Sequence, residues 1–510
     1  MNAKNGISRE LLYHISQGAF AERLSQNQRK EIHISSELDE FLDEKLEEGK
    51  QIILTGNPGD GKTQYIMMEK EEYDGFFLKD GSTWEPSELI EEWNEAYSEN
   101  RKGILAINDG PLQRLINDFS GDFEFLNDVD HMMENQIVMD DGYEHPNEDI
   151  ILIDLSKRSV LSTKIVKQAI EKLTTVHDTS EEMDKHISYN AEKLSQEEIK
   201  NSLSQMLSYI GVIDSSVTMR DLLNFIAYCI NGGKKEEVEN FDEDLKFYNL
   251  AYEGRGKLFD LFREHIDPKV LTHPYLDSVL WSETEEGMEF NDSDYDAEQV
   301  QKEFLRKKRR FLFGDKKVDE IGTKEVYDKT NENFLNYRNN ANLQPREKTE
   351  QLIQWLNSYF IPESDMTNSL LLWFSHNFRS KENQVIISRE EAHTDKFQYK
   401  VPKLNSEISD AITFHSNQYV LEYDPGQDFN RKPKMKIDKN LHETLSSLDL
   451  GVPYVMRDEK VERKILNFME EIQKREIGDE TRAKIRMKDT ETGDITKIKV
   501  NNDEFSLSGI

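Results

Sequence analysis

The sequence of 510 residues has one cysteine, Cys229, and no long apolar run. A lone cysteine excludes an intrachain disulfide framework and is typical of a reducing compartment. The longest apolar runs, such as Leu370–Phe374, are far too short to span a bilayer, and Met1–Ile15 lacks the apolar core of a secretion signal. We therefore expect a soluble, cytoplasmic protein without membrane contact.

The sequence also has few basic residues relative to acidic ones. The 65 lysines and arginines against 100 aspartates and glutamates give a net charge of −35, and a mean hydropathy of −0.76 indicates a very polar surface. This balance argues against general binding to nucleic acid or membranes. Screening over about 8 Å at physiological salt nevertheless lets a local basic patch act independently. The length predicts about three domains.

The stretch from Gln51 to Met68 contains the pattern G-x-x-x-x-G-K-T. The apolar run Gln51–Thr55 predicts a buried parallel strand, and the residues after the loop have helical spacing. Glycines leave backbone N–H groups free to surround a phosphate, Lys62 reaches the β- and γ-phosphates, and the Thr63 hydroxyl can hold Mg²⁺. The pattern predicts an ATP–Mg²⁺ site formed by Asn57, Pro58, Gly59, Asp60, Gly61, Lys62, Thr63 and Gln64.

Strand and helix patterns alternate after this motif. Apolar runs at Gly75–Lys79, Gly103–Asn108 and Asp149–Leu155 predict strands, and helices are expected at Glu85–Glu99 and Pro111–Phe119. Alternation of this kind predicts a parallel sheet that binds its ligand at the carboxyl ends of the strands.

A P-loop ATPase needs polar groups at these strand ends: an acid beside Mg²⁺ and the attacking water, and a residue that senses the γ-phosphate. Asn108 and Asp109 follow an apolar run, so we expect Asp109 to bind Mg²⁺ and assist hydrolysis. The usual pair at this position is Asp-Glu, and this sequence has Asn-Asp instead. Two alternatives therefore stay open: hydrolysis is slow, or Asp80 is the acid. Asp154 is expected to be the sensor, against an ordinary role as a turn residue.

The following part of the chain has a mainly helical pattern, and Ser216–Ile230 carries an apolar stripe on one face. A helical lid after a P-loop core is the arrangement of AAA+ ATPases, in which an arginine near the start of a lid helix contacts the γ-phosphate. Arg220 matches this role, or it is a solvated arginine next to Asp221. Arg158 is a second candidate, as a finger acting in a neighbouring subunit.

Several stretches resemble the ATPase subunit of phosphorothioation-dependent DNA restriction systems (the DptF or DndF type). The resemblance lies in GNPGDGKTQ, ILAINDGPLQRLI, ILIDLSKRSVL and VTMRDLLNFIAYCINGG, and later in FYNLAYEGRGKLFDLFREHIDP and FLRKKRRFLFG. It covers roughly the first two-thirds of the chain. It implies a bacterial defence ATPase that works with partner proteins against DNA lacking the protective backbone sulfur.

Positive charge is concentrated at two places. Arg306–Arg310 follows the acidic stretch Trp281–Val300, which we interpret as a linker or a mobile loop. The cluster neutralises phosphates, pairs with that stretch, or forms the charged side of an amphipathic helix. Near the C-terminus, Lys484–Lys488 and Ile495–Val500 flank a turn sequence, and the alternation predicts a hairpin with one basic face. Such a face contacts DNA or a partner, or protects an edge strand.

The remaining C-terminal residues mix helix patterns, such as Asn368–Phe378, with strand patterns. The histidines show no metal-ligand spacing, and no strand carries the acid-x-Lys pattern, so we do not expect a nuclease.

These patterns predict an α/β protein with an AAA+-like P-loop core, a helical lid and a C-terminal α+β module. The expected segments are an N-terminal helical segment (1–48), the ATPase core (49–160), the lid (161–280), the acidic linker with the basic helix (281–345) and the α+β module (346–510). With the resemblance, the expected function is an ATP-hydrolysing subunit of an anti-phage restriction complex, with other subunits, DNA and further copies of this chain as candidate partners. The alternatives are a nucleotide-gated scaffold that recruits an effector with little turnover, and a STAND-like signalling ATPase, although no repeats of a sensor array are seen.

Overall fold

The structure is a computed structural model of the whole chain. It describes residues 7–18, 24–69, 77–140, 142–175, 185–235, 242–286, 296–318, 321–323, 326, 329–339, 343–360, 367–372, 384–388, 390–426, 432–450, 459–476, 482–489, 495–501 and 504–509. The chain forms two compact units. The first comprises Met1–Lys329 and Lys403–His415, and the second comprises Thr330–Pro402 and Ser416–Ile510.

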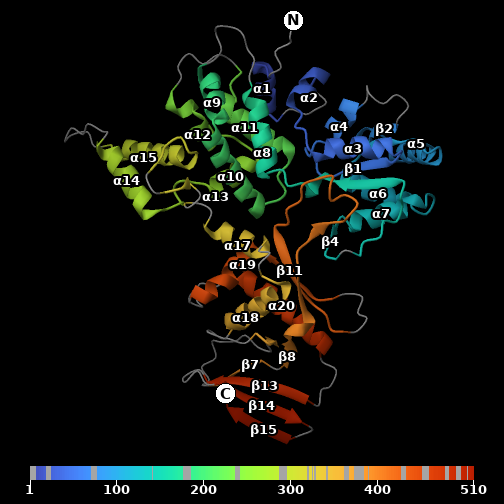
Figure 1. Ribbon diagram of the computed structural model, residues 1–510, viewed down its shortest axis with the longest axis vertical. Coiled ribbons are helices and arrows are strands. Elements are labelled where there is room, and N and C mark those ends of the chain that lie inside the picture. Colours follow the sequence, from blue (N-terminus) through green and yellow to red (C-terminus); the bar gives the residue numbers. More distant parts are fainter. Residues whose placement is uncertain are drawn as a thin grey trace. The chain divides into compact units, whose positions relative to one another are not determined.

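The first unit contains the predicted parallel sheet (Figure 1). Its strands are β1 (Gln51–Thr55), β2 (Phe77–Asp80), β3 (Gly103–Ala106) and β5 (Ile150–Asp154), in the order β2-β3-β1-β5. All three neighbouring pairs are parallel. The strand predictions are therefore confirmed to within a few residues, except that positions 75 and 76 lie outside the described residues.

Helices cover both faces of this sheet, which explains why β1, β3 and β5 contain continuous apolar runs. In β1, Ile52 and Leu54 face one layer and Ile53 faces the other, and each is at most 1% exposed. On one face lie α3 (Glu37–Glu47) and α4 (Lys62–Glu69), and on the other lie α5 (Pro86–Ser98), α6 (Asp109–Phe119) and α7 (Phe125–Glu134) (Figure 1).

A helical bundle forms the rest of the first unit around a second apolar core. Its central helix α11 (Met219–Asn231) begins with a capping box of Thr218 and Asp221 and ends at Gly232, whose φ of 63° is left-handed. The predicted helix at this place is confirmed. Further helices of the bundle are α1 (Arg9–Ser16), α2 (Gln26–Ile32), α8 (Thr163–Thr174), α9 (Lys185–Ser195), α10 (Glu197–Ile213), α12 (Phe247–Leu250) and α13 (Lys257–His265).

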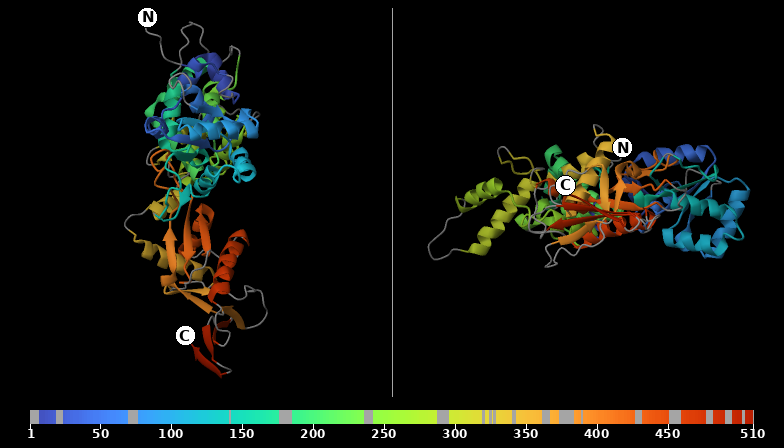
Figure 2. Two further views of the ribbon diagram at one scale, coloured as in Figure 1. Left: turned by 90° about the vertical axis from the view of Figure 1, so that its right-hand side faces the viewer. Right: turned by 90° about the horizontal axis from the view of Figure 1, so that it is seen from below.

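The predicted linker at Trp281–Val300 is partly wrong. Trp281 lies within α14 (Pro274–Glu286), and α15 (Ala297–Leu312) begins before the predicted linker ends. Residues 287–295 lie outside the described residues. The two helices pack against each other at one end of the unit, away from the sheet (Figure 2, yellow-green). Buried Leu276 and Leu280 of α14 and buried Val300 of α15 anchor the helices that enter this acidic stretch from both sides. None of the helices in the described part of the chain is long and apolar enough to cross a bilayer.

The second unit combines helices with antiparallel strands. Its sheets have the orders β12-β11-β9, β15-β14-β13-β7 and β6-β8. The strands are β6 (Ser369–Leu372), β7 (Gln384–Ser388), β8 (Glu390–His393), β9 (Phe397–Lys400), β11 (Gln418–Tyr423), β12 (Lys434–Asp438), β13 (Arg482–Asp489), β14 (Ile495–Asn501) and β15 (Glu504–Gly509). The helices are α17 (Lys329–Asn339), α18 (Pro345–Phe360), α19 (Lys439–Ser446) and α20 (Glu459–Glu476).

Two sequence predictions have different outcomes in this unit. The hairpin near the C-terminus is confirmed, because β13 and β14 pair antiparallel. The helix predicted at Asn368–Phe378 is wrong where the structure describes it, since Ser369–Leu372 is a strand paired with β8. Residues 373–378 lie outside the described residues. A short continuous apolar run fits a buried strand as well as a helix, and its pairing with β8 decides between them.

A buried histidine marks the core of the second unit. His442 is 2% exposed, and its Nδ1 lies 2.8 Å from the hydroxyl oxygen of Tyr419. The rings of Tyr337 and Trp355 surround it. Burial lowers the pKa of His442 to about 4, so this imidazole is neutral at physiological pH.

Candidate functional site

The glycine-rich loop between β1 and α4 depends on backbone conformations that favour glycine. Gly56, Gly59 and Gly61 have φ angles of 127°, 105° and 99°. A Cβ on Gly56 would lie 2.9 Å from a carboxylate oxygen of Asp60 and from the backbone nitrogen of Ser156. These glycines therefore permit both the turn and the close approach of neighbouring groups.

Lys62, the first residue of α4, is 7% exposed and points back into the loop. Its Nζ donates hydrogen bonds of 2.8 Å to the carbonyl oxygens of Gly56 and Asn57. Asp60 fixes the same loop by accepting a 2.7 Å bond from the Asn57 N–H. Burial lowers the pKa of Lys62, and four nearby carboxylates oppose this effect. They belong to Asp60, Asp109, Asp154 and Asp80.

Two of these carboxylates lie at the ends of neighbouring strands and contact different threonines. Asp80, at the end of β2, accepts a 2.8 Å hydrogen bond from the hydroxyl of Thr63. Asp109, which follows β3, accepts one of 2.5 Å from the hydroxyl of Thr55. The acid in direct contact with the predicted Mg²⁺ ligand Thr63 is thus Asp80, the alternative that the sequence left open.

The described residues hold no group of three histidine, cysteine or acidic side chains arranged to bind a metal ion by itself. Mg²⁺ is commonly held by one or two carboxylates together with substrate phosphates, so a threonine–carboxylate pair next to a phosphate-binding loop fits that mode. Thr63 and Asp80 form a threonine–carboxylate pair next to the glycine-rich loop.

Asp154 ends β5 and lies opposite Thr55 in the sheet. One carboxylate oxygen accepts a 2.8 Å bond from the Ser156 N–H, and the other lies 2.8 Å from Nζ of Lys157. These contacts are those of a residue that shapes a turn. Asp154 is also next to the loop, because a Cβ on Gly56 would lie 3.2 Å from its carboxylate.

Both predicted arginines belong to this neighbourhood. Arg220 lies in the first turn of α11, and its backbone N–H donates a 3.1 Å hydrogen bond to the carbonyl oxygen of Gly59. Arg158 is 4% exposed, and its guanidinium donates a 2.6 Å bond to the carbonyl oxygen of Asp60. This buried position inside its own chain does not fit a finger that reaches into a neighbouring subunit.

The glycine-rich loop borders a cavity of about 310 Å³. Its polar lining residues include Lys62, Thr63, Asp80, Asn108 and Arg220. Its apolar lining includes Ile15, Leu24, Ile32, Ile34, Met219 and Leu223. The volume lies in the range of about 300–1,000 Å³ that is usual for small-molecule sites. The cavity therefore suits a ligand with an anionic tail and a flat apolar group.

Sequence reasoning missed the apolar lining of the cavity. Its residues are Ile15 of α1, Leu24, Ile32 of α2, Ile34 and the start of α11, and the last of these lies far from the others in the sequence. Apolar spacing such as that of Leu11, Leu12 and Ile15 indicates a helix face but not what that face covers.

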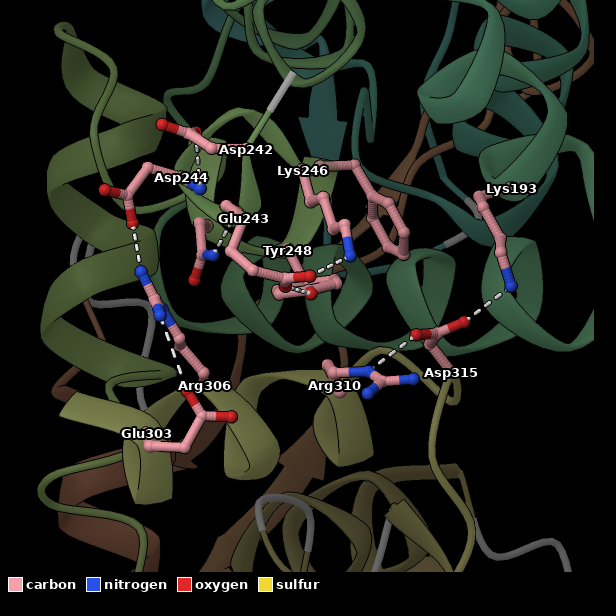
Figure 3. Close-up of polar contacts among 12 residues, drawn as sticks. Lys193, Asp242, Glu243, Asp244, Lys246, Tyr248, Glu303, Arg306, Arg310 and Asp315 are labelled. Carbon is pink, nitrogen blue, oxygen red and sulfur yellow. Dashed lines mark hydrogen bonds and ion pairs between the residues drawn. The ribbon is translucent and has the colours of Figure 1, made fainter. Parts of the chain in front are cut away.

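The basic cluster Arg306–Arg310 on α15 has a partner at each position inside the first unit. Lys308 is 2% exposed, and its Nζ lies 2.7 Å from a carboxylate oxygen of Asp277. Figure 3 shows Arg306 with Asp244 and Glu303, and Arg310 with Asp315. Lys307 donates to the carbonyl oxygen of Glu283, and Arg309 donates to Asn249 and lies over the Tyr252 ring. Among the sequence interpretations, the charged side of an amphipathic helix therefore fits best.

The hairpin of β13 and β14 carries the other concentration of positive charge. Its register places Lys484 opposite Lys499 and Arg486 opposite Lys497. Directly opposite residues of like charge destabilise a strand pair. On the next strand, Lys497 and Lys499 are opposite serines.

Comparison of the chain with models of known protein families, with curated proteins and with solved structures finds no match. The interpretation of this site therefore rests on its residues and geometry.

Proposed function

We propose that this chain is a P-loop ATPase with an AAA+-like core, which binds ATP and Mg²⁺ at the glycine-rich loop. The observation that carries the proposal is the cavity that joins this loop to an apolar wall. Glycines at positions of positive φ, a buried lysine and a threonine next to an acid are the groups that phosphate and Mg²⁺ require. The apolar wall suits the base of the nucleotide.

Each residue has a role that follows from its position. The N–H groups of the loop and Lys62 hold the phosphates, and the start of α4 adds its helix dipole. When bound, Mg²⁺ supplies charge neutralisation of the phosphates. Thr63 and Asp80 would hold it, with Asp109 as the competing carboxylate. The start of α11, with Arg220, acts as the edge of a lid.

Asn108 and Asp154 complete the strand ends of the proposed site. Asn108 lines the cavity and precedes α6. An amide at this place can orient a water molecule or a phosphate oxygen by hydrogen bonds. Asp154 orders the turn after β5, and we assign it to holding that turn at the loop.

The proposed biological role comes from the sequence resemblance. In this role, the chain drives or licenses a restriction complex that acts on DNA lacking phosphorothioate protection. Of the two basic features, the hairpin of β13 and β14 is the one we assign to DNA, since the α15 cluster has partners within its own unit. A nucleotide-gated scaffold is the competing function.

Phosphate release from ATP by the full chain, with and without duplex DNA, tests this proposal. A DNA-stimulated rate that Lys62→Ala abolishes supports the motor. ATP binding with no release under either condition supports the scaffold. Absence of both binding and release would refute the ATPase assignment.

A further inference from the structure

A short segment of the chain, Lys403–His415, lies in the first unit although the residues on both sides belong to the second. We call it the return segment. It connects β9 with β11, which are neighbouring antiparallel strands of the second unit. The chain therefore leaves that unit after one strand, packs into the first unit and comes back to form the adjacent strand.

The return segment is part of the core beneath the parallel sheet. Its β10 (Lys403–Leu404) pairs with β4 (Ile137–Val138), drawn next to each other in Figure 1. Leu404, Ile408 and Ile412 are buried in the same cluster as residues of β1, β3 and β5. Such burial means that the segment moves only if the sheet around it repacks.

Gln136 joins the return segment to the end of β5. Its backbone carbonyl accepts a 3.1 Å bond from the N–H of Asn405. Its side chain is buried, donates a 2.9 Å bond to the carbonyl oxygen of Leu152 and accepts one of 3.0 Å from the N–H of Asp154. One amide thus supplies both a donor and an acceptor to the outer edge of β5, as a neighbouring strand would.

Ser159 makes a second connection at the far end of the same turn. Its N–H donates a 2.8 Å bond to the carbonyl oxygen of Thr413, and its hydroxyl accepts a 2.8 Å bond from the N–H of His415. The preceding residue is Arg158, which holds the carbonyl oxygen of Asp60 in the glycine-rich loop. The turn from Asp154 to Ser159 is therefore held at both ends by the return segment, directly or through Gln136.

We propose that Gln136 and the return segment are positioning elements that link occupancy of the nucleotide site to the β9–β11 connection of the second unit. Gln136 fixes Asp154, Ser159 fixes Arg158, and both lead to the loop that holds phosphate. Linkage is reciprocal, so a nucleotide that stabilises the loop also stabilises the return segment, and loosening the segment weakens nucleotide binding. This inference rests on the proposed nucleotide binding.

Hydrogen exchange of the full chain, with and without saturating ADP and Mg²⁺, tests the linkage. We expect slower exchange both in the glycine-rich loop and in the return segment. Gln136→Glu loses the donor to Leu152 and should weaken nucleotide binding by about 5- to 150-fold, the usual range of coupling between sites. When the variant and the parent chain are compared at the same fraction of bound nucleotide, Gln136→Glu should still show slower exchange in the glycine-rich loop. It should no longer show slower exchange in the return segment.

Two further variants separate positioning from damage to the fold. Asn405→Ala keeps the backbone bond to Gln136 but removes the side-chain donor to the carbonyl oxygen of the preceding residue, Asn135, and should show the same loss. Gln113→Glu is the matched control, because it changes a glutamine of α6 that bonds Asp130 at 3.3 Å. It should behave as the parent chain does. Hydrogen exchange of each variant is also measured without nucleotide. Damage to the fold alone would change this exchange rate.

The outcomes distinguish this inference from the proposed function. Protection of the loop without any change in the return segment would overturn the linkage alone. Absence of protection in both would overturn nucleotide binding and the linkage with it.

Discussion

Asp80 and Asp109 offer a matched test of the proposed Mg²⁺ site. Asp80 ends β2, Asp109 begins the helix that follows the adjacent parallel strand β3, and the two contact different threonines. Thr63 is the expected Mg²⁺ ligand, so replacing Asp80 by Asn removes the charge next to the proposed metal position. We expect turnover to fall by about 10²- to 10⁴-fold, the order found when a positioned acid or base is lost. This corresponds to about 3–5 kcal/mol of transition-state stabilisation.

The same variant should leave the fold and metal-free binding nearly intact. An asparagine oxygen still accepts the bond from Thr63, so the free energy of unfolding should change by about 1 kcal/mol or less. Binding of ADP without Mg²⁺ should be unchanged or tighter, because one negative charge next to the phosphates is gone.

Phosphate release at saturating ATP over a Mg²⁺ titration measures the effect, with Asp109→Asn as the comparison. We expect Asp109→Asn to lose less activity and to keep its Mg²⁺ dependence. The assignment is refuted if Asp109→Asn loses 10²-fold or more while Asp80→Asn stays within about threefold of the parent.

Three further predictions concern the charges outside the site. Asp277→Asn leaves Lys308 buried without its carboxylate, and urea denaturation should show that the free energy of unfolding falls by about 2–4 kcal/mol. Breaking a buried ion pair costs about 3–5 kcal/mol, and the contact of Lys308 with the Phe304 ring offsets part of this loss. Glu198→Gln breaks an exposed ion pair with Lys317 and should lower the free energy of unfolding by less than about 1 kcal/mol. If Asp277→Asn and Glu198→Gln cause equally small losses, the basic cluster of α15 has no structural role. Replacing Lys484, Arg486 and Lys499 together by Gln should reduce the log–log salt slope of duplex DNA binding by about 3, whereas the same change at Arg306, Lys307 and Arg310 should not. An unchanged slope in both would remove the hairpin from DNA contact. Burial lowers the pKa of His442 to about 4, so between pH 6.5 and 4 this histidine takes up a proton in the unfolded chain but not in the folded unit. Acid should therefore lower the free energy of unfolding of the second unit by about 3 kcal/mol over this range. His442→Gln should flatten that part of the pH–stability curve, and parallel curves would show that other groups cause it.

Local sequence was sufficient to predict the elements that carry the site. The apolar run Gln51–Thr55, the glycine spacing and the helix after it are set within a few residues, and the structure has each of them in place. The caps of α11 are equally local, since Thr218, Asp221 and Gly232 act on neighbouring backbone.

Features that depend on distant parts of the chain could not be predicted in the same way. The contact of Asp80 with Thr63 depends on strand order, which long-range pairing decides. The apolar lining of the cavity, the partners of Arg306–Arg310 and the return segment each join residues widely separated in sequence. Composition identifies such residues as apolar or charged but does not give their partners.

Equilibrium binding of ATP with Mg²⁺ to the full chain and to Lys62→Ala tests whether the glycine-rich loop binds nucleotide. Lys164→Ala, which removes an exposed lysine paired with Glu37, is the matched control. Charge-assisted bonds to phosphate contribute about 1.5–3 kcal/mol each, so losing two of them should weaken ATP binding by about 10²-fold or more. We predict this loss in a Lys62→Ala chain with an unchanged circular dichroism spectrum and none in Lys164→Ala. Unchanged ATP affinity in folded Lys62→Ala would contradict the account.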